Sequence, residues 1–252
     1  MLSTIGEHLL LLEKMEIKRF FVSPSAITDG IITITGDEHV HLSNVLRFRV
    51  GYKLIVCDNS GLDYHAEVVS ITSSKTVCKI DYVEKNLTEH KTKIILLYGL
   101  IKPEKFEIGL QKAVELGVSE IIPFISRNTQ EKSVRTDRLK RIVLEACKQC
   151  GRSILPTICE PVTFDEALKR AEGLKIIAYE KEKQKSFKSV LKNLPEYDKV
   201  SLAIGSEGGF TIDEVASAES QGFESVSLGL RILRAETAVI TGLANISLFL
   251  ED

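Results

Sequence analysis

The chain has 252 residues, of which 44% are hydrophobic and 27% charged, and its formal net charge is −2 at pH 7. These values are typical of a globular protein with one large or two ordinary domains, and they argue against a surface coated in positive charge. No apolar run approaches the roughly 18–20 residues that a membrane-spanning helix needs, so we expect no membrane association.

Five cysteines are an odd number in a chain too long to need disulfide bonds, which favours a cytoplasmic protein. Cys147 and Cys150 have the spacing of a CxxC motif, but they lie in a helical pattern with no second pair and no nearby histidine. We interpret them as two partly buried thiols rather than as a zinc or redox site. No metal cluster is expected among the five histidines either.

The N-terminal third is rich in short β-strand patterns. The segment from Met15 has the character of a natural start, so residues 1–14 are predicted to be an N-terminal extension. A short helix is expected between Asp37 and Phe48, because Asp37 can cap it. The remaining runs predict a small β-barrel-like domain over residues 15–88, with strands at 31–35, 53–57, 66–71 and 77–83.

From Lys93 onward, strand and helix patterns alternate, which predicts an α/β domain with a mostly parallel sheet over residues 89–252. The unbroken apolar run 94–98 is typical of a strand buried on both faces. Helices are predicted to begin at Pro103 and after the capping boxes Thr163/Glu166 and Thr211/Glu214. Further strands are predicted at 120–125, 174–179, 200–204 and 225–228, and further helices at 136–150, 187–194 and 235–250.

Positive charge gathers in the middle of the chain. Residues 91–155 carry a net +6, whereas residues 1–90 carry −3 and residues 156–252 carry −5. Such a patch suits a phosphate backbone, but a solvated helix face explains it equally well.

Two glycine-anchored segments, 203–210 and 228–238, each follow a predicted strand and lead into a predicted helix. Glycines at such positions are often simple turn residues, yet two strand-to-helix loops of this kind can build a small-molecule pocket at the strand ends. Neither loop has the spacing of a phosphate-binding motif, which disfavours an ATP site or a nucleotide-dependent oxidoreductase.

Together the two segments resemble a known pair of motifs. Gly205-Ser206-Glu207-Gly208-Gly209-Phe210-Thr211-x-x-Glu214 and Leu228-Gly229-x-Arg231-Ile232-Leu233-Arg234-x-Glu236-Thr237-Ala238 are similar to the C-terminal motifs of the SPOUT methyltransferases, and more narrowly of the ribosomal RNA small subunit methyltransferase E family. The resemblance runs from Met15 to the end. It includes Lys18-Arg19-Phe20-Phe21-Val22, His39-x-His41-Leu42-x-x-Val45-Leu46-Arg47, Lys112-Ala113-x-Glu115-Leu116-Gly117-Val118 and Glu145-Ala146-x-x-Gln149-x-x-Arg152. Ser206 departs from the family, which usually has proline there.

The resemblance implies a C-terminal α/β domain with a deep trefoil knot and a PUA- or OB-like N-terminal barrel that faces RNA. It also implies a homodimer that uses S-adenosyl-L-methionine to methylate N3 of a uridine in small-subunit rRNA, free or in the assembled subunit. The cofactor-binding residues carried over are Ala203, Ile204, Gly205, Glu207, Gly208, Gly209, Leu228, Gly229, Ile232, Leu233, Thr237 and Ala238.

Three charged residues are the candidates for catalysis. Arg234 would stabilise the anion that develops at N3, and Glu207 or Glu236 would accept the proton. Glu236 has a structural alternative, because acids in the first turn of a helix favour its dipole. Arg231 is equally a candidate for a phosphate contact or a dimer contact.

The candidate RNA contacts are Arg19, His41, Arg47, Arg49, Arg127, Arg135, Arg138 and Arg152, with Phe20 or Phe21 stacking on an unpaired base. Core packing is the alternative role for both phenylalanines. Two other functions stay open: another SPOUT RNA methyltransferase, acting on a ribose 2′-O or on tRNA, and a non-catalytic ribosome assembly factor. The target nucleotide and the catalytic base are not fixed by the sequence.

Overall fold

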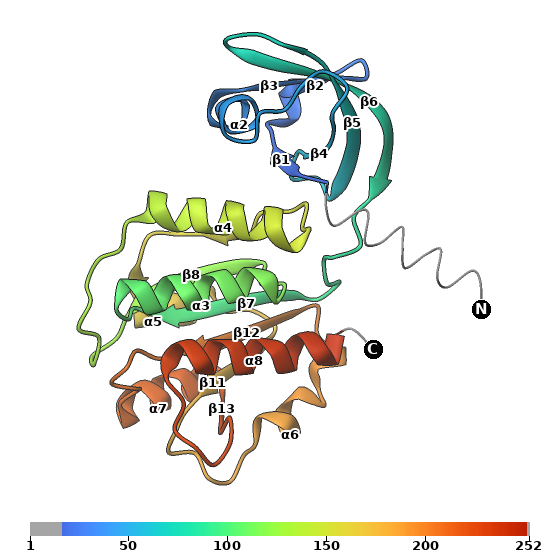
Figure 1. Ribbon diagram of the computed structural model, residues 1–252. Helices are drawn as coiled ribbons and strands as arrows, with labels where there is room; N and C mark the ends of the chain where they lie inside the picture. Colours follow the sequence, from blue (N-terminus) through green and yellow to red (C-terminus); the bar gives the residue numbers. More distant parts are fainter. Residues whose placement is uncertain (1–16, 251–252) are drawn as a thin grey trace. The chain divides into compact units, whose positions relative to one another are not determined.

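The computed structural model describes residues 17–250, which divide into two compact units (Figure 1). One unit comprises residues 17–89 and 147–155, and the other comprises 90–146 and 156–250. The predicted extension at 1–14 lies outside the described residues. Within 17–250, no helix is both long and apolar enough to cross a membrane.

The first unit is a curled six-stranded sheet in the order β1-β4-β5-β6-β3-β2 (Figure 1). β1 pairs with β4 in parallel, and the other neighbours are antiparallel. Side chains on the inner face of the sheet form one core, which includes Phe20, Ile34, Leu54 and Val68. The strands are β1 Arg19–Phe21, β2 Ile27–Thr28, β3 Ile31–Thr35, β4 Lys53–Cys57, β5 Leu62–Ile71 and β6 Lys75–Lys85.

The helix expected at 37–48 is shorter than predicted. It consists of α2, Gly36–Val40, which continues into a π-helical turn at His41–Val45. Arg47 then adopts the left-handed backbone conformation with φ 54°. A non-glycine residue in that conformation cannot continue a right-handed helix, so the chain leaves the helix before Phe48.

A buried ion pair connects the sheet of the first unit to the segment 147–155. Arg19 donates to both carboxylate oxygens of Asp63 at 2.7 Å, and Ser153 donates to the same carboxylate. Asn86 bridges Asp63 and the carbonyl oxygen of Gly151 with two hydrogen bonds of 3.0 Å. The carboxylate therefore has its hydrogen bonds supplied by three parts of the chain that are distant in sequence.

This arrangement corrects two of the predicted RNA contacts. The side chain of Arg19 is only 12% exposed and pairs with Asp63, while that of Arg152 is 3% exposed and pairs with Glu89 at 2.7 Å. Both arginines hold the first unit together instead of facing a solvent-borne phosphate. Phe20 is fully buried in the core, so the structure assigns it to packing rather than to base stacking.

The Asp63 carboxylate makes stability depend on pH. Burial acts to raise the pKa of Asp63, but the hydrogen bonds from Arg19, Ser153 and Asn86 outweigh it and lower that pKa below 3.8. The resulting stabilisation of the folded state is complete at pH values above 3.8. It is lost as the pH falls through the lower pKa that Asp63 has in the folded protein. We expect Asp63→Asn to cost about 3 kcal/mol or more at neutral pH, because it leaves Arg19 uncompensated.

Urea unfolding followed between pH 7 and pH 3 tests this expectation. The stability difference between wild type and Asp63→Asn should shrink towards the acid end. A difference that stays constant with pH would show that Asp63 titrates normally in the folded protein.

The second unit contains a seven-stranded sheet in which all pairs are parallel, as the alternating pattern predicted. Six strands follow the order β10-β8-β7-β12-β11-β13, and β9 also pairs with β8. The strands are β7 Lys93–Gly99, β8 Glu120–Ile125, β9 Thr157–Ile158, β10 Val162–Thr163, β11 Leu174–Ala178, β12 Lys199–Ile204 and β13 Glu224–Val226.

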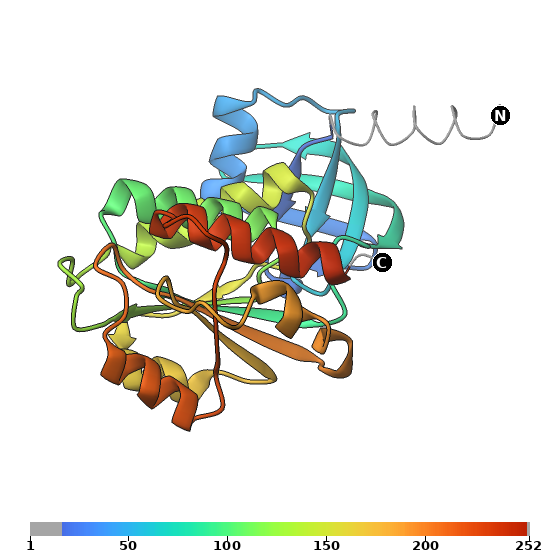
Figure 2. The same cartoon turned by 90° about the horizontal axis from the view of Figure 1, so that it is seen from below.

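Helices cover both faces of this sheet (Figure 2). On one face lie α3 (Pro103–Glu115), α4 (Thr136–Cys150) and α8 (Ala235–Leu250). On the other lie α5 (Phe164–Arg170) and α7 (Ile212–Ser220), both with the predicted capping boxes. The helix predicted at 187–194 is shorter, with α6 at Phe187–Leu191 beside β13.

Strand alternation decides which side chains meet which helices. Ile95 and Leu97 of β7 join the core under α5 and α7, while Tyr98, the next residue along the strand, stacks on Phe106 of α3 at a ring distance of 4.5 Å. α8 follows β13 at the edge of the sheet and packs against α3 and β12, so the chain crosses back over the sheet before it ends.

The Tyr98 hydroxyl fills the space above Gly109 of α3. A Cβ atom at position 109 would lie 2.5 Å from Tyr98 Oη and 3.0 Å from two ring carbons. Alanine is favoured over glycine within a helix by about 1 kcal/mol, yet overpacking a tight core costs about 1–3 kcal/mol. We therefore expect Gly109→Ala to lower the free energy of unfolding.

The double variant Gly109→Ala/Tyr98→Phe should recover part of that loss, because it removes the closest atom. Urea unfolding of the two single variants and the double variant measures the coupling. Additive effects would contradict the steric account.

Candidate active site

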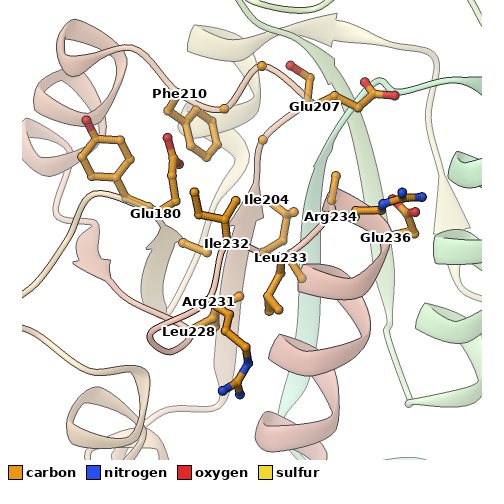
Figure 3. A pocket seen from close by; sticks show the side chains of 18 of the residues that line it. Glu180, Ile204, Glu207, Phe210, Leu228, Arg231, Ile232, Leu233, Arg234 and Glu236 are labelled. Atoms are coloured by element: carbon orange, nitrogen blue, oxygen red, sulfur yellow. The ribbon is translucent and has the colours of Figure 1, made fainter.

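A cavity of about 500 Å³ opens at the carboxyl ends of β11, β12 and β13 (Figure 3). Its walls come from three segments, 178–180, 204–210 and 227–238, together with Lys105 of α3. The carboxyl edge of a parallel sheet is where α/β proteins commonly bind ligands. Both glycine-anchored segments identified in the sequence thus line one cavity.

Most of the predicted cofactor and catalytic residues line this cavity. Two predicted cofactor residues do not. The side chain of Ala203 is buried in the core under α5 and α7, and Thr237 lies exposed in the first turn of α8. The predicted residues that do line the cavity are Ile204, Gly205, Glu207, Gly208, Gly209, Leu228, Gly229, Ile232, Leu233, Arg234, Glu236 and Ala238.

Sequence reasoning missed one wall of the cavity, and it assigned Arg231 only as a phosphate or dimer contact. The end of β11 contributes Ala178, Tyr179 and Glu180, because β11 pairs directly with β12. The strand itself was predicted, but its place beside β12 was not, and only that place brings its end to the cavity. Other lining residues that were not assigned to the site are Lys105, Ser206, Phe210, Ser227 and Ala235.

The loop after β12 passes very close to the end of β7. A Cβ atom on Gly99 would lie 2.7 Å from the backbone nitrogen of Ser206 and 2.8 Å from the carbonyl carbon of Gly205. Any larger residue at position 99 would push the loop away. The side chain of Asn128 secures the far end of the loop by donating to the carbonyl oxygens of Gly208 and Gly209 at 3.0 and 3.2 Å.

Gly205 lines the cavity and also lies against a buried aromatic ring. A Cβ atom at this position would meet the ring of Phe210 at 3.2–3.4 Å. Phe210 is itself buried, so a bulky residue at 205 would disturb packing behind the loop as well as the cavity.

Glu207 is held at the N-terminal end of α3. Its Oε1 atom accepts a hydrogen bond of 3.2 Å from the backbone nitrogen of Lys102, the residue that caps this helix. The partial positive charge of a helix N-terminus stabilises a carboxylate placed there. The loop after β12 and the start of α3 are therefore connected through a charged group.

Within residues 17–250, three side-chain atoms next to the cavity are buried and find no hydrogen-bond partner: Tyr98 Oη, Ser206 Oγ and Glu236 Oε2. Burial, followed by the charges of Glu236 and Glu207, raises the pKa of the Tyr98 phenol, so it stays protonated at neutral pH. Unsatisfied buried polar atoms are rare in folded proteins and cost free energy, so their gathering here points to a functional site.

The side chains that line the cavity differ between its two sides. Glu180 and Phe210 lie on one side, while Glu207, Arg234 and Glu236 lie on the other (Figure 3). Arg234 is exposed, and within residues 17–250 no ion pair joins it to a carboxylate. A free guanidinium beside two carboxylates provides both a cation and proton acceptors for chemistry on a bound molecule.

The other predicted RNA contacts lie in varied surroundings. Arg127 is exposed but pairs with Asp213 at 2.8 Å, and Arg138 is exposed but pairs with Glu107. The side chain of His41 is half-buried. Among these predicted RNA contacts, Arg47, Arg49 and Arg135 are exposed, and the described part of the chain shows no ion pair for them.

One cysteine of the CxxC spacing and one acidic cluster lie outside the cavity and have internal surroundings. Burial raises the pKa of Cys147 to about 12, which leaves this CxxC thiol unreactive at neutral pH. In the described residues, one group brings three potential metal ligands together: Asp63, His65 and Glu84. Asp63 already binds Arg19, however, and His65 bonds to Glu84 at 2.9 Å.

Comparison with known proteins identifies two domains. Residues 88–247 match the RNA methyltransferase domain, and residues 34–81 match the RNA methyltransferase PUA domain. The first match covers most of the second unit and contains the whole cavity lining. The second covers most of the curled sheet, which agrees with the expected barrel-like N-terminal domain.

Two curated relatives that match most of the chain have the same name. The chain is 32% identical to the ribosomal RNA small subunit methyltransferase E of Rickettsia conorii, covering 93% of this chain and 96% of the relative. It is 30% identical to that of Bacillus subtilis, covering 85% and 89%.

Two solved structures are similar over nearly the whole chain. A ribosomal RNA small subunit methyltransferase E from Neisseria gonorrhoeae, bound to S-adenosyl methionine, has a TM-score of 0.83 at 27% identity and covers 92% of this chain and 98% of its own. A putative methyltransferase from Legionella pneumophila, in complex with the same cofactor, has a TM-score of 0.80 at 28% identity and covers 92% and 98%. With its two matched domains and its full-length relatives, this chain belongs to the ribosomal RNA small subunit methyltransferase E family.

Proposed function

We propose that this protein is an S-adenosyl-L-methionine-dependent methyltransferase that acts on N3 of a uridine in small-subunit rRNA. The observation that carries the proposal is the single cavity lined by both motif segments, with Arg234, Glu207 and Glu236 on one side of it. Two similar structures hold this cofactor, and the relatives are named for the ribosomal substrate.

The cavity suits the cofactor in size and chemistry. Its volume of about 500 Å³ lies within the roughly 300–1,000 Å³ of small-molecule sites. Ile204, Leu228 and Leu233 offer apolar contact for an adenine ring. The unpartnered Ser206 Oγ and Glu236 Oε2 leave polar capacity beside the cavity that a bound molecule could satisfy.

The chemical step needs a donor and a deprotonated acceptor. S-adenosyl-L-methionine supplies an electrophilic methyl group on a sulfonium. Uridine N3 carries a proton and is a poor nucleophile until that proton leaves. Arg234 would stabilise the negative charge that develops on the base, and Glu207 or Glu236 would take the proton as the methyl group forms its bond to N3.

We further propose that the protein works as a homodimer with a knotted second unit. Leu230, Ile232, Ile108 and Leu248 are large apolar side chains that are at least half exposed, and the last two lie on the neighbouring helices α3 and α8. Exposed apolar side chains of this size favour a protein contact. The return of α8 from the sheet edge to α3 supports the expected knot.

A cytoplasmic location and an rRNA partner complete the proposal. All five cysteines are free thiols, which suits a reducing compartment. The net +6 of residues 91–155 and the exposed arginines provide charge for phosphate contacts. Whether the substrate is free rRNA or the assembled small subunit is decided by comparing methyl transfer to the two.

Cofactor binding can be tested by filling the cavity from α8. Ala238 lines the cavity, and a leucine side chain there would occupy part of the cavity volume. We therefore expect Ala238→Leu to weaken binding of S-adenosyl-L-methionine about tenfold or more. Ala244→Leu is the matched control, because Ala244 lies on the same helix outside the cavity lining. Calorimetric titration measures both. Equal affinity in Ala238→Leu and wild type would place the cofactor elsewhere.

The chemical role of Arg234 can be tested by single-turnover methyl transfer. If its cation acts mainly in the transition state, Arg234→Ala should bind the cofactor normally but react about 10²–10³-fold more slowly. Arg234→Lys should recover only part of the rate, because the compact ammonium group of lysine cannot reproduce the planar set of N–H donors of the guanidinium. Arg170→Ala, at the end of α5 and outside the cavity lining, is the control and should react as wild type.

The readout is transfer to rRNA with the product mapped by mass spectrometry. N3-methyluridine supports the proposed reaction, whereas a 2′-O-methyl product or a modified tRNA would favour another SPOUT activity. A wild-type rate in Arg234→Ala would remove this residue from the chemical step.

A further inference from the structure

Residues 45–52 form an exposed surface on the first unit that combines apolar, aromatic and basic side chains. We call it the 45–52 surface. Val45 is 65% exposed, Val50 is 62% exposed and Tyr52 is 46% exposed. Arg47 and Arg49 lie between them and are also exposed. Large apolar and aromatic side chains gathered so closely on a surface indicate a binding site.

The ring of Tyr52 is held in place from behind. It packs against Phe48 at a ring distance of 5.3 Å, and Phe48 makes an edge contact at 5.8 Å with Phe20, which is fully buried. The backbone of Tyr52 is also fixed, because its nitrogen donates to Arg49 and its carbonyl accepts from Val68. The exposed part of the ring is therefore presented by a rigid support and needs little ordering when it binds a ligand.

The backbone next to Tyr52 is strained. Arg47 has φ 54°, a conformation that large side chains rarely adopt. It follows the π-helical turn His41–Val45 with one residue between them, and hydrogen bonds from Leu46 to His41 and from Phe48 to Leu42 hold it there. Both features are concentrated at functional sites in proteins, and here they lie in the segment that carries two exposed arginines.

The charged residues within 45–52, Arg47 and Arg49, are both basic. Residues 39–57 contain no Asp or Glu. Within the described chain, neither Arg47 nor Arg49 forms an ion pair. Tyr82 provides a contrast on the same sheet. It is 50% exposed and stacks on His65 at 4.2 Å, but it lies between Asp81 and Glu84, where a phosphate would be repelled.

We propose that the 45–52 surface is a stacking platform for single-stranded RNA, on which Tyr52 receives an unpaired base while Arg47 and Arg49 contact the adjoining phosphates. An aromatic face combined with flanking arginines matches the two parts of a nucleotide. Bases within a duplex are already stacked on one another, so such a platform selects unpaired RNA. The proposal rests on the proposed function only in taking RNA as the substrate.

Binding of an oligoribonucleotide that carries 2-aminopurine tests the platform with the full-length protein. Tyr52→Ala should weaken binding of the single strand about tenfold or more and remove the fluorescence quenching that stacking causes. Tyr52→Phe should keep both, since it retains the ring. Tyr82→Ala, the matched exposed tyrosine, should bind as wild type.

Each alternative outcome overturns the platform. Unchanged binding in Tyr52→Ala, or an equal loss in Tyr82→Ala, would show that Tyr52 does not stack on a base. A duplex that binds as tightly as the single strand and loses as much affinity in Tyr52→Ala would show that the surface does not select unpaired bases. Because Tyr52→Ala removes a packing contact, Arg47→Ala and Arg49→Ala give an independent check: each should lower the slope of log affinity against log salt by about 1.

Methyl transfer separates this proposal from the proposed function. Tyr52→Ala should raise the KM for RNA and leave kcat and cofactor affinity unchanged, because the platform lies outside the cavity. If the wild-type protein binds RNA through Tyr52 but transfers no methyl group, the proposed reaction fails and the platform stands. If transfer is normal and Tyr52→Ala has no effect on KM, the reaction stands and the platform fails.

Discussion

The cavity depends on one close contact between two backbones, where the end of β7 passes against the loop that follows β12. Gly99 has no side chain to separate them, and a Cβ atom there would lie 2.7 Å from the nitrogen of Ser206. Because β7 and β12 are parallel neighbours, both chains turn away from the sheet at the same edge. The contact brings Glu207 to the first turn of α3, where the backbone nitrogen of Lys102 binds its carboxylate. Glu207 can therefore take its position in the cavity because Gly99, on the neighbouring strand β7, has no side chain.

Two clusters of polar side chains show how structural and functional demands differ. Around Asp63, buried charge is fully paired: Arg19, Ser153 and Asn86 supply the hydrogen bonds, and burial is tolerated for that reason. Beside the cavity, Tyr98 Oη and Glu236 Oε2 are also buried but have no hydrogen-bond partner in the part of the chain that the structure describes. A fold selected for stability alone would pair or remove such groups. The first cluster therefore accounts for the integrity of the N-terminal unit, and the second marks where a ligand completes the structure.

The sequence predicted the features that depend on local pattern and left out those that depend on spatial order. The apolar run of β7, the bounds of β8 and the capping boxes of α5 and α7 follow from alternation and from short-range hydrogen bonds, so they could be read directly. Strand order is not local, and for that reason Glu180 was missed although its strand was predicted. The two-residue strands β9 and β10 are too short to produce a pattern. The roles of Arg19 and Arg152 were mistaken because a surface arginine and a buried one look alike until the segment 147–155 is known to join the first unit.

The difference between Phe20 and Tyr52 links the fold to the choice of substrate. In the three-residue strand β1, alternation turns Phe20 into the core, so an aromatic residue that resembled a stacking group became a support. Phe48 packs between Phe20 and Tyr52, and the turn at 49–52 leaves Tyr52 partly exposed. N3 of uridine is occupied by a hydrogen bond in a base pair, so a methyltransferase acting there needs an unpaired base. A platform that favours single-stranded RNA would bind targets that are already unpaired. The binding energy of the cavity would then remain available for the transition state, since none of it is needed to open a duplex.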